Sequence, residues 1–489
     1  MNSALRIARH ELRLAWRSGL VWVLAAAATA LMLAATMIGT QRHQATRQQR
    51  DAYQATVASQ FRDQPDRHPH RVAHYGFLVF RPPSPLGFFD SGLEDHAGST
   101  IFLEAHRQNG ATFSDASQSD GLRRVGDLTM AVVLQVFVPV LVFGVAGTLV
   151  TREREAGTLP LLLCQGASWP AILWGKWLGA LGITALVLLP STALAAAWLA
   201  LVSDITFDGD TAARAAMLAI LHAAYLAACA AIAIVVSARQ STSRGAVSAL
   251  LATWVLLWIV VPRLAPMVAA SLHPVPPRAE FEARVERRLR ELGDSHDPDD
   301  PRFQALRRET LAAYGVSRVE DLPVNYNGIV TQEGERLSSE AFEAHQQALV
   351  ATYRRQMGVL DAASALSPLV AMRQASMALT GTDLPHTLAF DQDAERYRYT
   401  LVQALNTLHA TEVEHARDRY AGSGERDAPS RQRIDASHWQ DLPPFVAGHP
   451  TLHEALRARP TPLLIVVGWT MLAAVLLWRA ARSARGASS

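Results

Sequence analysis

The chain has 489 residues, 49% of them hydrophobic and 18% charged, and its formal net charge is +2. These averages fit a large soluble enzyme or a membrane protein whose aqueous parts dilute its apolar spans, and they give no reason to expect a nucleic-acid partner. The distribution of apolar residues along the chain decides between the two classes.

Six runs without charged residues are long enough to cross the ~30 Å hydrocarbon core of a bilayer as helices. They are Leu20–Ile38, Leu128–Val150, Trp177–Val202, Ala215–Ala238, Ala246–Val261 and Thr461–Trp478. The first follows arginines, as a signal peptide does, but its apolar run of about nineteen residues exceeds a signal h-region and Thr36-Met37-Ile38 is a poor cleavage site. We therefore predict an all-α polytopic membrane protein with six transmembrane helices, the first a retained anchor, and a mainly helical extracytoplasmic domain.

The predicted division follows these spans. It places an interfacial amphipathic helix at 1–17, the first span at 18–38, an extracytoplasmic insert at 39–127, spans two to five at 128–270 with a cytoplasmic loop at 151–176, a large helical extracytoplasmic insert at 271–459, and the sixth span with a cytoplasmic tail at 460–489. Residues 1–17 alternate an apolar face with arginines, which favours a helix in the membrane interface over a solvated stub.

Positive residues gather in four places, which predicts that these places face the cytoplasm. They are Arg6, Arg9, Arg13 and Arg17; Arg152, Arg154 and Lys176; Arg239 and Arg244; and Arg479, Arg482 and Arg485. The third connection has Asp204, Asp208 and Asp210 against Arg214 and is expected outside. Both termini are therefore predicted inside, with the two long inserts outside because long domains cross largely regardless of charge.

The first insert is expected to begin as a helix at Gln41–Arg62, after which prolines break it into loops and short extended pieces. The second insert is expected to be mainly helical, with helical patterns at Arg278–Leu292, Pro301–Tyr314, Ser338–Met357 and Ala394–Tyr420. We expect the two inserts to form one domain, because the apolar stretches AHYGFLVF and SMALTGTD would not stay solvated separately. Ser367–Phe390 and 322–332 are expected to be loops or turns, and 421–450 a poorly structured return to the membrane. Because the two cysteines, Cys164 and Cys229, lie outside both inserts, packing alone must hold the outer domain.

Several polar residues and prolines are candidates for function. His68, His70 and His74 are weak candidates for binding a soft divalent metal, because no cysteine or methionine cluster accompanies them, and ordinary surface or hydrogen-bonded histidines are the alternative. His222 in the fourth span is a candidate for a polar path, with a hydrogen bond between helices as the alternative. Pro262, Arg263 and Pro266 are expected to bend or end the fifth span and to form an outer gate, unless Arg263 only reaches the headgroups.

The sequence lacks the common catalytic and nucleotide-binding motifs. The sequence has no GxxxxGK[ST] phosphate loop, no GxGxxG after a strand, no HExxH and no CxxC pair. We therefore expect no enzyme and no cofactor in this chain.

A charged loop, Thr151–Lys176, separates two apolar spans. Alternating Glu and Arg, a Gly-Thr turn and a short apolar helix suit docking in a groove of a soluble partner, with Leu159, Leu161 and Leu162 adding apolar area. An ordinary connecting loop that obeys the positive-inside rule is the alternative.

The chain resembles ABC transporter permeases of the ABC-2 type, in an uncharacterised branch with large extracytoplasmic inserts. Glu153-Arg154-Glu155-Ala156-Gly157-Thr158-Leu159, followed by Gly175-Lys176, carries the resemblance. AHYGFLVFRPPSPL, LPVNYNGI, SMALTGTD and AERYRYTLVQALN resemble further stretches of the same branch. Pro160 and Leu161 depart from the charged residue that many relatives have after this motif.

The resemblance implies the permease subunit of an ATP-driven exporter in a bacterial inner membrane. Glu153, Arg154, Glu155, Gly157, Thr158 and Leu159 would couple it to a separate ATPase subunit that binds ATP and Mg²⁺. The other expected partners are a second permease chain, identical or not, and the lipid bilayer. Two alternatives stay open: a permease-like subunit for periplasmic metal-site maturation or copper handling, and an ATP-driven mechanotransmitter or assembly factor without transport.

Overall fold

A computed structural model describes residues 2–114, 128–203, 205, 207–415, 418 and 433–483. It confirms an all-α polytopic membrane protein, with six helices long and apolar enough to cross a membrane. The sequence-based expectations for Asp204, Arg485 and residues 421–432 lie outside the described residues.

Six helices are candidate transmembrane spans, and two of them consist of several consecutive helical elements. They are α2 (Leu20–Arg62); α5 (Met130–Val132), η2 (Val133–Phe137), α6 (Val138–Ala146) and α7 (Thr151–Glu155); α9 (Trp169–Leu201); α10 (Gly209–Arg239); α11 (Ser243–Trp254), η3 (Val255–Val260) and α12 (Val261–Leu272); and α20 (Pro460–Arg482). An amphipathic helix, α1 (Asn2–Arg17), precedes them.

Two π-helical turns interrupt the second and fifth spans, each directly before a proline-containing segment. The turn η2 leads into Pro139, and η3 leads into Pro262. A proline lacks an N–H, and a local change of helix type accommodates that loss. The fifth span therefore does not end at Pro262 or Pro266, and α12 runs on to Leu272.

The described residues of 63–114 and 273–459, together with the distal part of α2, form one body, here called the insert domain. Its elements are α3 (Pro69–Tyr75), β1 (Phe77–Phe80), β2 (Thr100–Leu103), α13 (Arg278–Leu292), η4 (Pro301–Phe303), α14 (Gln304–Tyr314), η5 (Val319–Asp321), α15 (Tyr326–Leu366), α16 (Pro368–Thr380), α17 (Leu384–Glu412), α18 (Ser437–Gln440) and α19 (Leu452–Ala458). The strands pair antiparallel, with Phe77 opposite Leu103.

Both inserts supply one hydrophobic core. Phe61, Val72 and Val79 of the first insert pack with Leu405 and the fully buried Trp439 of the second. Neither insert could bury these side chains alone, so the two long inserts fold as a unit.

The expectation of turns at Ser367–Phe390 is wrong, because this stretch forms α16 and the start of α17. Ser367 caps α16 through the Val370 N–H, and Gly381 ends it in the left-handed region with φ of 82°. Asp383 then caps α17 through the His386 N–H. The residues that indicate turns in the sequence are helix caps here. Likewise, α15 begins at Tyr326 with Asn325 as its cap, inside the expected loop 322–332.

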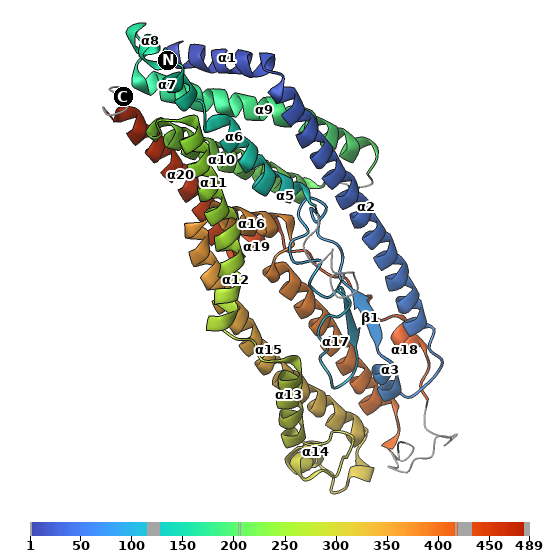
Figure 1. Ribbon diagram of the computed structural model, residues 1–489. Coiled ribbons are helices and arrows are strands. Elements are labelled where there is room, and N and C mark those ends of the chain that lie inside the picture. Colours follow the sequence, from blue (N-terminus) through green and yellow to red (C-terminus); the bar gives the residue numbers. More distant parts are fainter. Residues whose placement is uncertain are drawn as a thin grey trace.

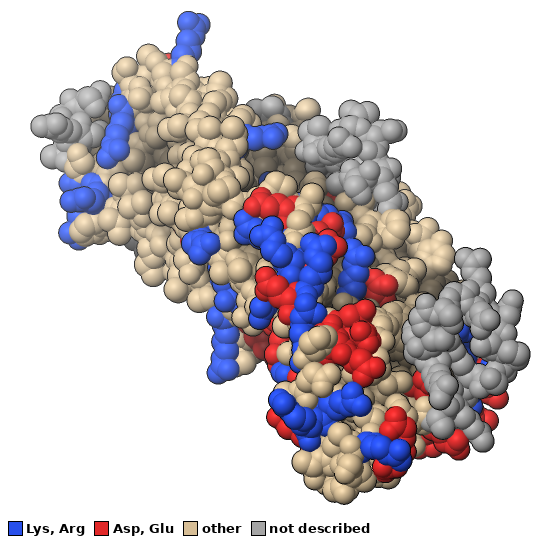
Figure 2. Space-filling model, turned by 90° about the horizontal axis from the view of Figure 1, so that it is seen from below, with Lys and Arg blue, Asp and Glu red and all other residues tan. Residues whose placement is uncertain are grey.

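The molecule is elongated (Figure 1). Both chain termini, α1, α7 and α8 (Thr158–Cys164) lie at one end, and α14 lies at the other. On the face shown in Figure 2, acidic side chains gather over one half of the molecule, whereas broad uncharged surface covers much of the other.

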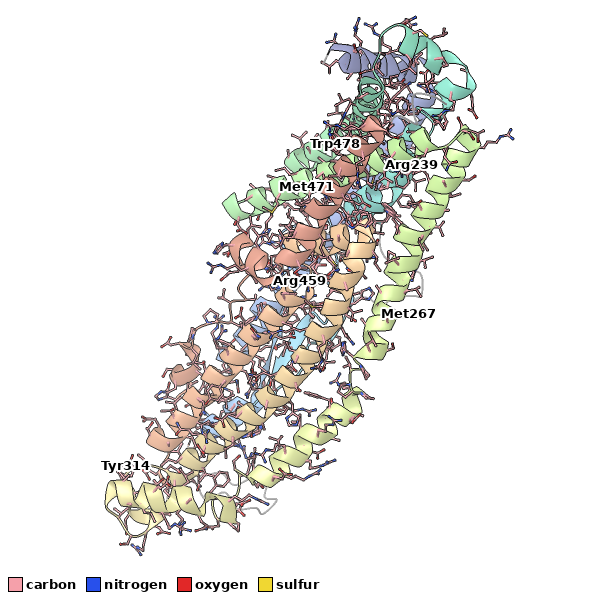
Figure 3. All side chains as sticks on the ribbon, turned by 90° about the vertical axis from the view of Figure 1, so that its left-hand side faces the viewer. Arg239, Met267, Tyr314, Arg459, Met471 and Trp478 are labelled. Carbon is pink, nitrogen blue, oxygen red and sulfur yellow. The ribbon has the colours of Figure 1, made fainter. Side chains whose placement is uncertain are left out.

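The outer faces of α11 to α12 and α20 carry the apolar surface expected of a membrane protein. Met267 and Met471 are each 66% exposed, and Arg459 and Arg482 flank the span α20. Figure 3 shows Met471 and Trp478 along α20 above Arg459. Twenty-three helical residues rise about 35 Å, enough to cross the ~30 Å hydrocarbon layer.

Candidate functional site

The helix of the second span ends in the short α7, which is joined at Gly157 to a second short helix, α8, and we refer to α7 and α8 together as the loop between the second and third spans. Gly157 has φ of 68° and ψ of 12°, a left-handed conformation that favours glycine, and a Cβ there would meet no atom within 4 Å. Ser168 then caps α9 by accepting a hydrogen bond from the Ala171 N–H. The glycine thus fixes the angle between α7 and α8 without being packed against anything.

Buried charges connect this loop to α1 and α9. The Lys176 Nζ lies 2.5 Å from Glu11 Oε1 and 2.6 Å from Glu153 Oε1, and Lys176 and Glu11 are each 1% exposed. Arg152 donates to the other oxygen of Glu11, and Thr158 donates to Glu153. Two carboxylates and two cations therefore join three segments that are far apart in sequence.

A second set of bonds connects α7 to the junction of α10 and α11. The Ser243 N–H and hydroxyl donate to Glu155, at 2.9 and 2.5 Å. Arg154 donates to the carbonyls of Ala238, at 3.2 Å, and Gln240. Any displacement of α7 must therefore move α10 and α11 or break these bonds.

Of the six predicted coupling residues, four have their polar groups engaged inside the chain and one is buried. Glu153, Arg154, Glu155 and Thr158 make the bonds above, and Leu159 is only 3% exposed. The exposed surface of the loop comprises residues 155–157, Pro160, Leu161, which is 59% exposed, and residues 164–166. Most of the sequence motif therefore anchors the loop, and the surface around Gly157 and Leu161, here called the tip, faces outward.

The helix α1 packs closely on α9 through glycines. A Cβ at Gly175 would lie 2.8 Å from the Ala4 carbonyl oxygen, and one at Gly179 would lie 2.8 Å from the Glu11 Cβ. Small residues permit such close approach of two helices. This approach brings Glu11 to Lys176, a partner that sequence reasoning missed, although Glu11 lies on the packed face of the amphipathic α1 with Ala8 and Leu12.

An apolar cavity of about 700 Å³ lies between α2, α9, α10 and the loop that precedes α5. Met32, Phe88, Leu181 and Leu218 line it, and His222 is among its few polar residues. The His222 Nδ1 lies 2.8 Å from the Leu218 carbonyl oxygen, and its Nε2 lies 3.4 Å from Gln135. His222 therefore makes helix hydrogen bonds and also lines a cavity.

The other three gate candidates do not join His222. Pro262, Arg263 and Pro266 lie on α12 and are absent from the lining of this cavity. Arg263 and Pro266 are exposed on the surface of the described structure.

The histidines of the first insert separate into two neighbouring groups. His70 and His74 meet His106 and His296, all with ligand nitrogens within 4.8 Å of one another. Burial, with smaller contributions from His106 and His296, lowers the pKa of His74 to about 4, and burial also lowers the pKa of His70 and His296. His70, His74 and His296 are therefore neutral at pH 7.

His68 belongs to the other group. Its Nε2 lies 3.2 Å from Asp418 Oδ1, and the His409 Nε2 lies 2.6 Å from Asp418 Oδ2. Burial would raise the pKa of Asp418, but the hydrogen bonds from His409 and His68 hold it well below its usual range. Sequence reasoning missed His106, His296, His409 and Asp418, because no spacing pattern links them to His68–His74.

Residues 278–447 match the family described as a domain of unknown function (DUF3526). No curated protein matched the chain in the comparison. The matched residues extend from the start of α13 past α18, so they comprise most of the second insert and none of the loop with α7 and α8.

Within the matched region, α16 joins the insert domain to the membrane bundle. Its Leu369, Met372 and Leu379 belong to the same hydrophobic core as the spans. The buried Arg214, at the start of α10, donates to the Leu379 carbonyl at 3.1 Å. A movement of α10 would therefore reach the insert domain through α16.

Proposed function

We propose that this chain is the membrane-spanning subunit of an ATP-driven exporter of the ABC-2 type, without ATPase activity of its own. The observation that carries the proposal is the loop formed by α7 and α8, because it is bonded to α1, α9, α10 and α11 yet presents an unpaired apolar tip. A connecting loop needs neither the buried charges nor the exposed leucine.

In this proposal the loop acts as a rigid lever. A cytoplasmic ATPase subunit, carrying ATP and Mg²⁺, contacts the tip around Gly157 and Leu161. Its movement passes through Glu153 and Lys176 to α1 and α9, and through Glu155 and Ser243 to α11. Buried ion pairs suit this task because separating them leaves uncompensated charges, which is strongly unfavourable.

The cavity between α2, α9 and α10 supports a transported substrate that is apolar or amphiphilic. Its lining is almost entirely hydrocarbon, and its volume falls within the range of sites for small molecules. It lies beside α10, the helix that the lever contacts at one end and α16 contacts at the other.

A second permease chain would complete the transporter. The fifth and sixth spans are among the spans least covered within the chain, with 17% and 22% of their apolar windows buried. These spans present the exposed side chains of Met267 and Met471, and either lipid or a second chain would cover them.

The proposal is tested by purifying the tagged full chain from its native membranes. We expect an ATP-hydrolysing subunit to co-purify with it, and we expect Leu161→Asp to reduce co-purification at least tenfold, because a charge at the tip opposes apolar contact. Leu201→Asp is the matched control, since Leu201 is 84% exposed at the opposite end of α9.

Two results would count against the proposal. One is wild-type chain, intact in the membrane, with no associated ATP hydrolysis. The other is equal retention of the ATPase by the Leu161 and wild-type proteins.

A further inference from the structure

We propose that His70, His74, His106 and His296 form a binding site for one divalent late transition-metal ion, of which Zn²⁺ is the representative. The site lies in the insert domain and is separate from the exporter function proposed above. Four imidazoles are a ligand set suited to Zn²⁺, Cu²⁺ and Ni²⁺ rather than to Mg²⁺ or Ca²⁺.

The spacing of the nitrogens fits a tetrahedral ion. Zn–N bonds of 2.0–2.1 Å place two ligand nitrogens about 3.3 Å apart. The Nε2 atoms of His70 and His74 are 3.0 Å apart, and those of His74 and His296 are 3.4 Å apart. His70 and His74 lie one helical turn apart on α3, so a single short helix supplies two ligands.

His106 is held as a metal-ligating histidine is held. Its Nδ1 lies 3.2 Å from Glu335 Oε2, and its backbone N–H donates to the same oxygen at 2.8 Å. Both ring nitrogens of His106 are buried, and neither has a hydrogen-bond partner. A carboxylate near Nδ1 favours the tautomer that carries its proton on Nδ1, which leaves Nε2 able to bind a metal.

The carboxylate of Glu335 is itself fixed. It is fully buried and lies 2.6 Å from the buried guanidinium of Arg398. His106 also adopts φ of 60°, a left-handed conformation that non-glycine residues rarely adopt outside functional sites and turns.

His296 repeats this arrangement. Its Nδ1 lies 3.1 Å from Asp294 Oδ1, which directs Nε2 toward His74. Hydrogen bonds among the four rings do not give every ring nitrogen a partner, because the His70 Nδ1 and the His106 Nε2 are buried without one. Buried polar atoms without partners are uncommon, and at least the His106 Nε2 is accounted for by a bound ion.

The adjacent group of His68, His409 and Asp418 serves a different purpose. Asp418 also accepts hydrogen bonds from Asn325, at 2.7 Å, and from Asn327. With His409, these donors all bond to Oδ2 of Asp418, so this group is a hydrogen-bonded support for α3. The proposed ion site consists of the four histidines alone.

The ion would connect the two inserts. His70, His74 and His106 come from the first, whereas His296 comes from the turn between α13 and η4 in the second. His74 is exposed and His106 and His296 are partly exposed, so an ion can enter from solution without opening the fold.

The test uses the full chain, purified in detergent with a tag free of histidine and stripped of metal with a chelator. We expect about one Zn²⁺ per chain after dialysis, measured by elemental analysis, and the visible absorption of four-coordinate Co²⁺ when cobalt replaces zinc. We expect His106→Ala and His296→Gln each to weaken Zn²⁺ binding at least tenfold.

His345→Ala on α15 is the matched control and should bind Zn²⁺ as the wild type does, because His345 lies outside the group. His296→Gln lies on a partly exposed turn and is the variant least able to disturb folding, which size-exclusion elution verifies. The proposal is overturned if wild type retains less than a tenth of an equivalent, or if a folded His296→Gln protein binds Zn²⁺ with unchanged affinity. If His106→Ala does not fold, the Co²⁺ spectrum of the wild type becomes the deciding measurement. A wild-type spectrum without four-coordinate Co²⁺ absorption would refute the site.

Discussion

At the scale of single residues, Lys176 shows how a charge can be kept inside a membrane bundle. It contacts one carboxylate from α1 and one from α7, and Arg152 shares the first of these. Ionised groups are tolerated in such places when each has a partner of opposite charge. These ion pairs therefore join α1, α7 and α9.

Gly157 offers a test of the lever by backbone strain alone. Gly157→Val forces a β-branched residue into the left-handed region, at a cost of about 1–3 kcal/mol, while its side chain meets open space. We expect the variant to reach the membrane at the wild-type level but to lose at least half of the ATP hydrolysis of the co-purified complex.

Asparagine tolerates the left-handed region, so Gly157→Asn should restore most of that activity. Gly144→Val is a further control, since Gly144 is helical and also faces open space. Full activity in the Gly157→Val complex would mean that the angle between α7 and α8 is irrelevant to coupling.

Asp391 on α17 predicts a pH-dependent stability. Burial raises its pKa from 3.8 to about 6, with the charge of Arg81 opposing the rise, and its Oδ1 is buried without a partner. Because the pKa of Asp391 is higher in the folded protein than in the unfolded chain, the free energy of unfolding is greatest below pH 3.8 and falls as the pH rises through about 6. Asp391→Asn should therefore raise the free energy of unfolding at pH 7.5 by roughly 1–2 kcal/mol and leave it unchanged near pH 4.

The measurement is thermal unfolding of wild type and variant in detergent at the two pH values. Asp393→Asn on the same helix is the control, because Asp393 pairs with Arg396 at 2.8 Å and gains nothing from neutralisation. A stabilisation by Asp391→Asn that is larger at pH 4 than at pH 7.5 would contradict the argument.

The residues of the candidate sites were only partly predictable from sequence. The loop motif and the pair His70 and His74 stand out because their members are close in the chain. Glu11, His106 and His296 are isolated in sequence, and only the folded contacts bring them to their partners. Chemistry assembled across more than a hundred residues leaves no local spacing to detect.

At the scale of elements, the close packing of α1 on α9 makes a quantitative prediction. Gly179→Val introduces atoms where a Cβ already lies 2.8 Å from Glu11, so α1 must shift. Overpacking of this kind costs about 1–3 kcal/mol, and displacing Glu11 also weakens its contact with Lys176. We expect a lower melting temperature and faster proteolysis within residues 2–17.

Gly468→Val on α20 is the matched control, because a Cβ at Gly468 meets nothing within 4 Å. It should melt within a degree or two of wild type. Equal stability of the two variants would show that α1 is not held against α9.

The elements also show where sequence patterns succeed and fail. Apolar runs locate all six spans, since their length and lack of charge reflect the bilayer itself. The pattern fails at α16, because Ser367, Gly381 and Asp383 resemble turn residues and act as caps of consecutive helices. The mainly helical second insert was foreseeable, and so were the short extended pieces of the first, which form β1 and β2. That the two inserts form one domain was also expected, but the residues of their shared core were not visible in either insert alone.

At the scale of the whole molecule, the distribution of charge leads us to predict one orientation in the membrane. The end with α1, α7, α8 and both termini carries Arg152, Arg239 and Arg482, and the insert domain occupies the other end (Figure 1). Excess Lys and Arg beside the spans favours the cytoplasm. The proposed ATPase contacts and the proposed metal site would then lie on opposite sides of the membrane.

Cysteine labelling with a membrane-impermeant maleimide tests this orientation on intact cells. Cys164 is exposed on α8, and Cys229 is buried, so Cys229→Ala leaves one reactive native thiol. We expect this thiol to be labelled only after lysis.

In a protein without Cys164 and Cys229, Asp299→Cys should instead be labelled on intact cells, because the Asp299 side chain is 80% exposed in the insert domain. The two positions serve as controls for each other. Labelling of Asp299→Cys shows that the reagent reaches the outer face of intact cells, and labelling of Cys164 after lysis shows that this thiol is reactive. Labelling of Cys164 on intact cells, with Asp299→Cys protected until lysis, would invert the molecule and place the loop where no cytoplasmic ATPase can reach it.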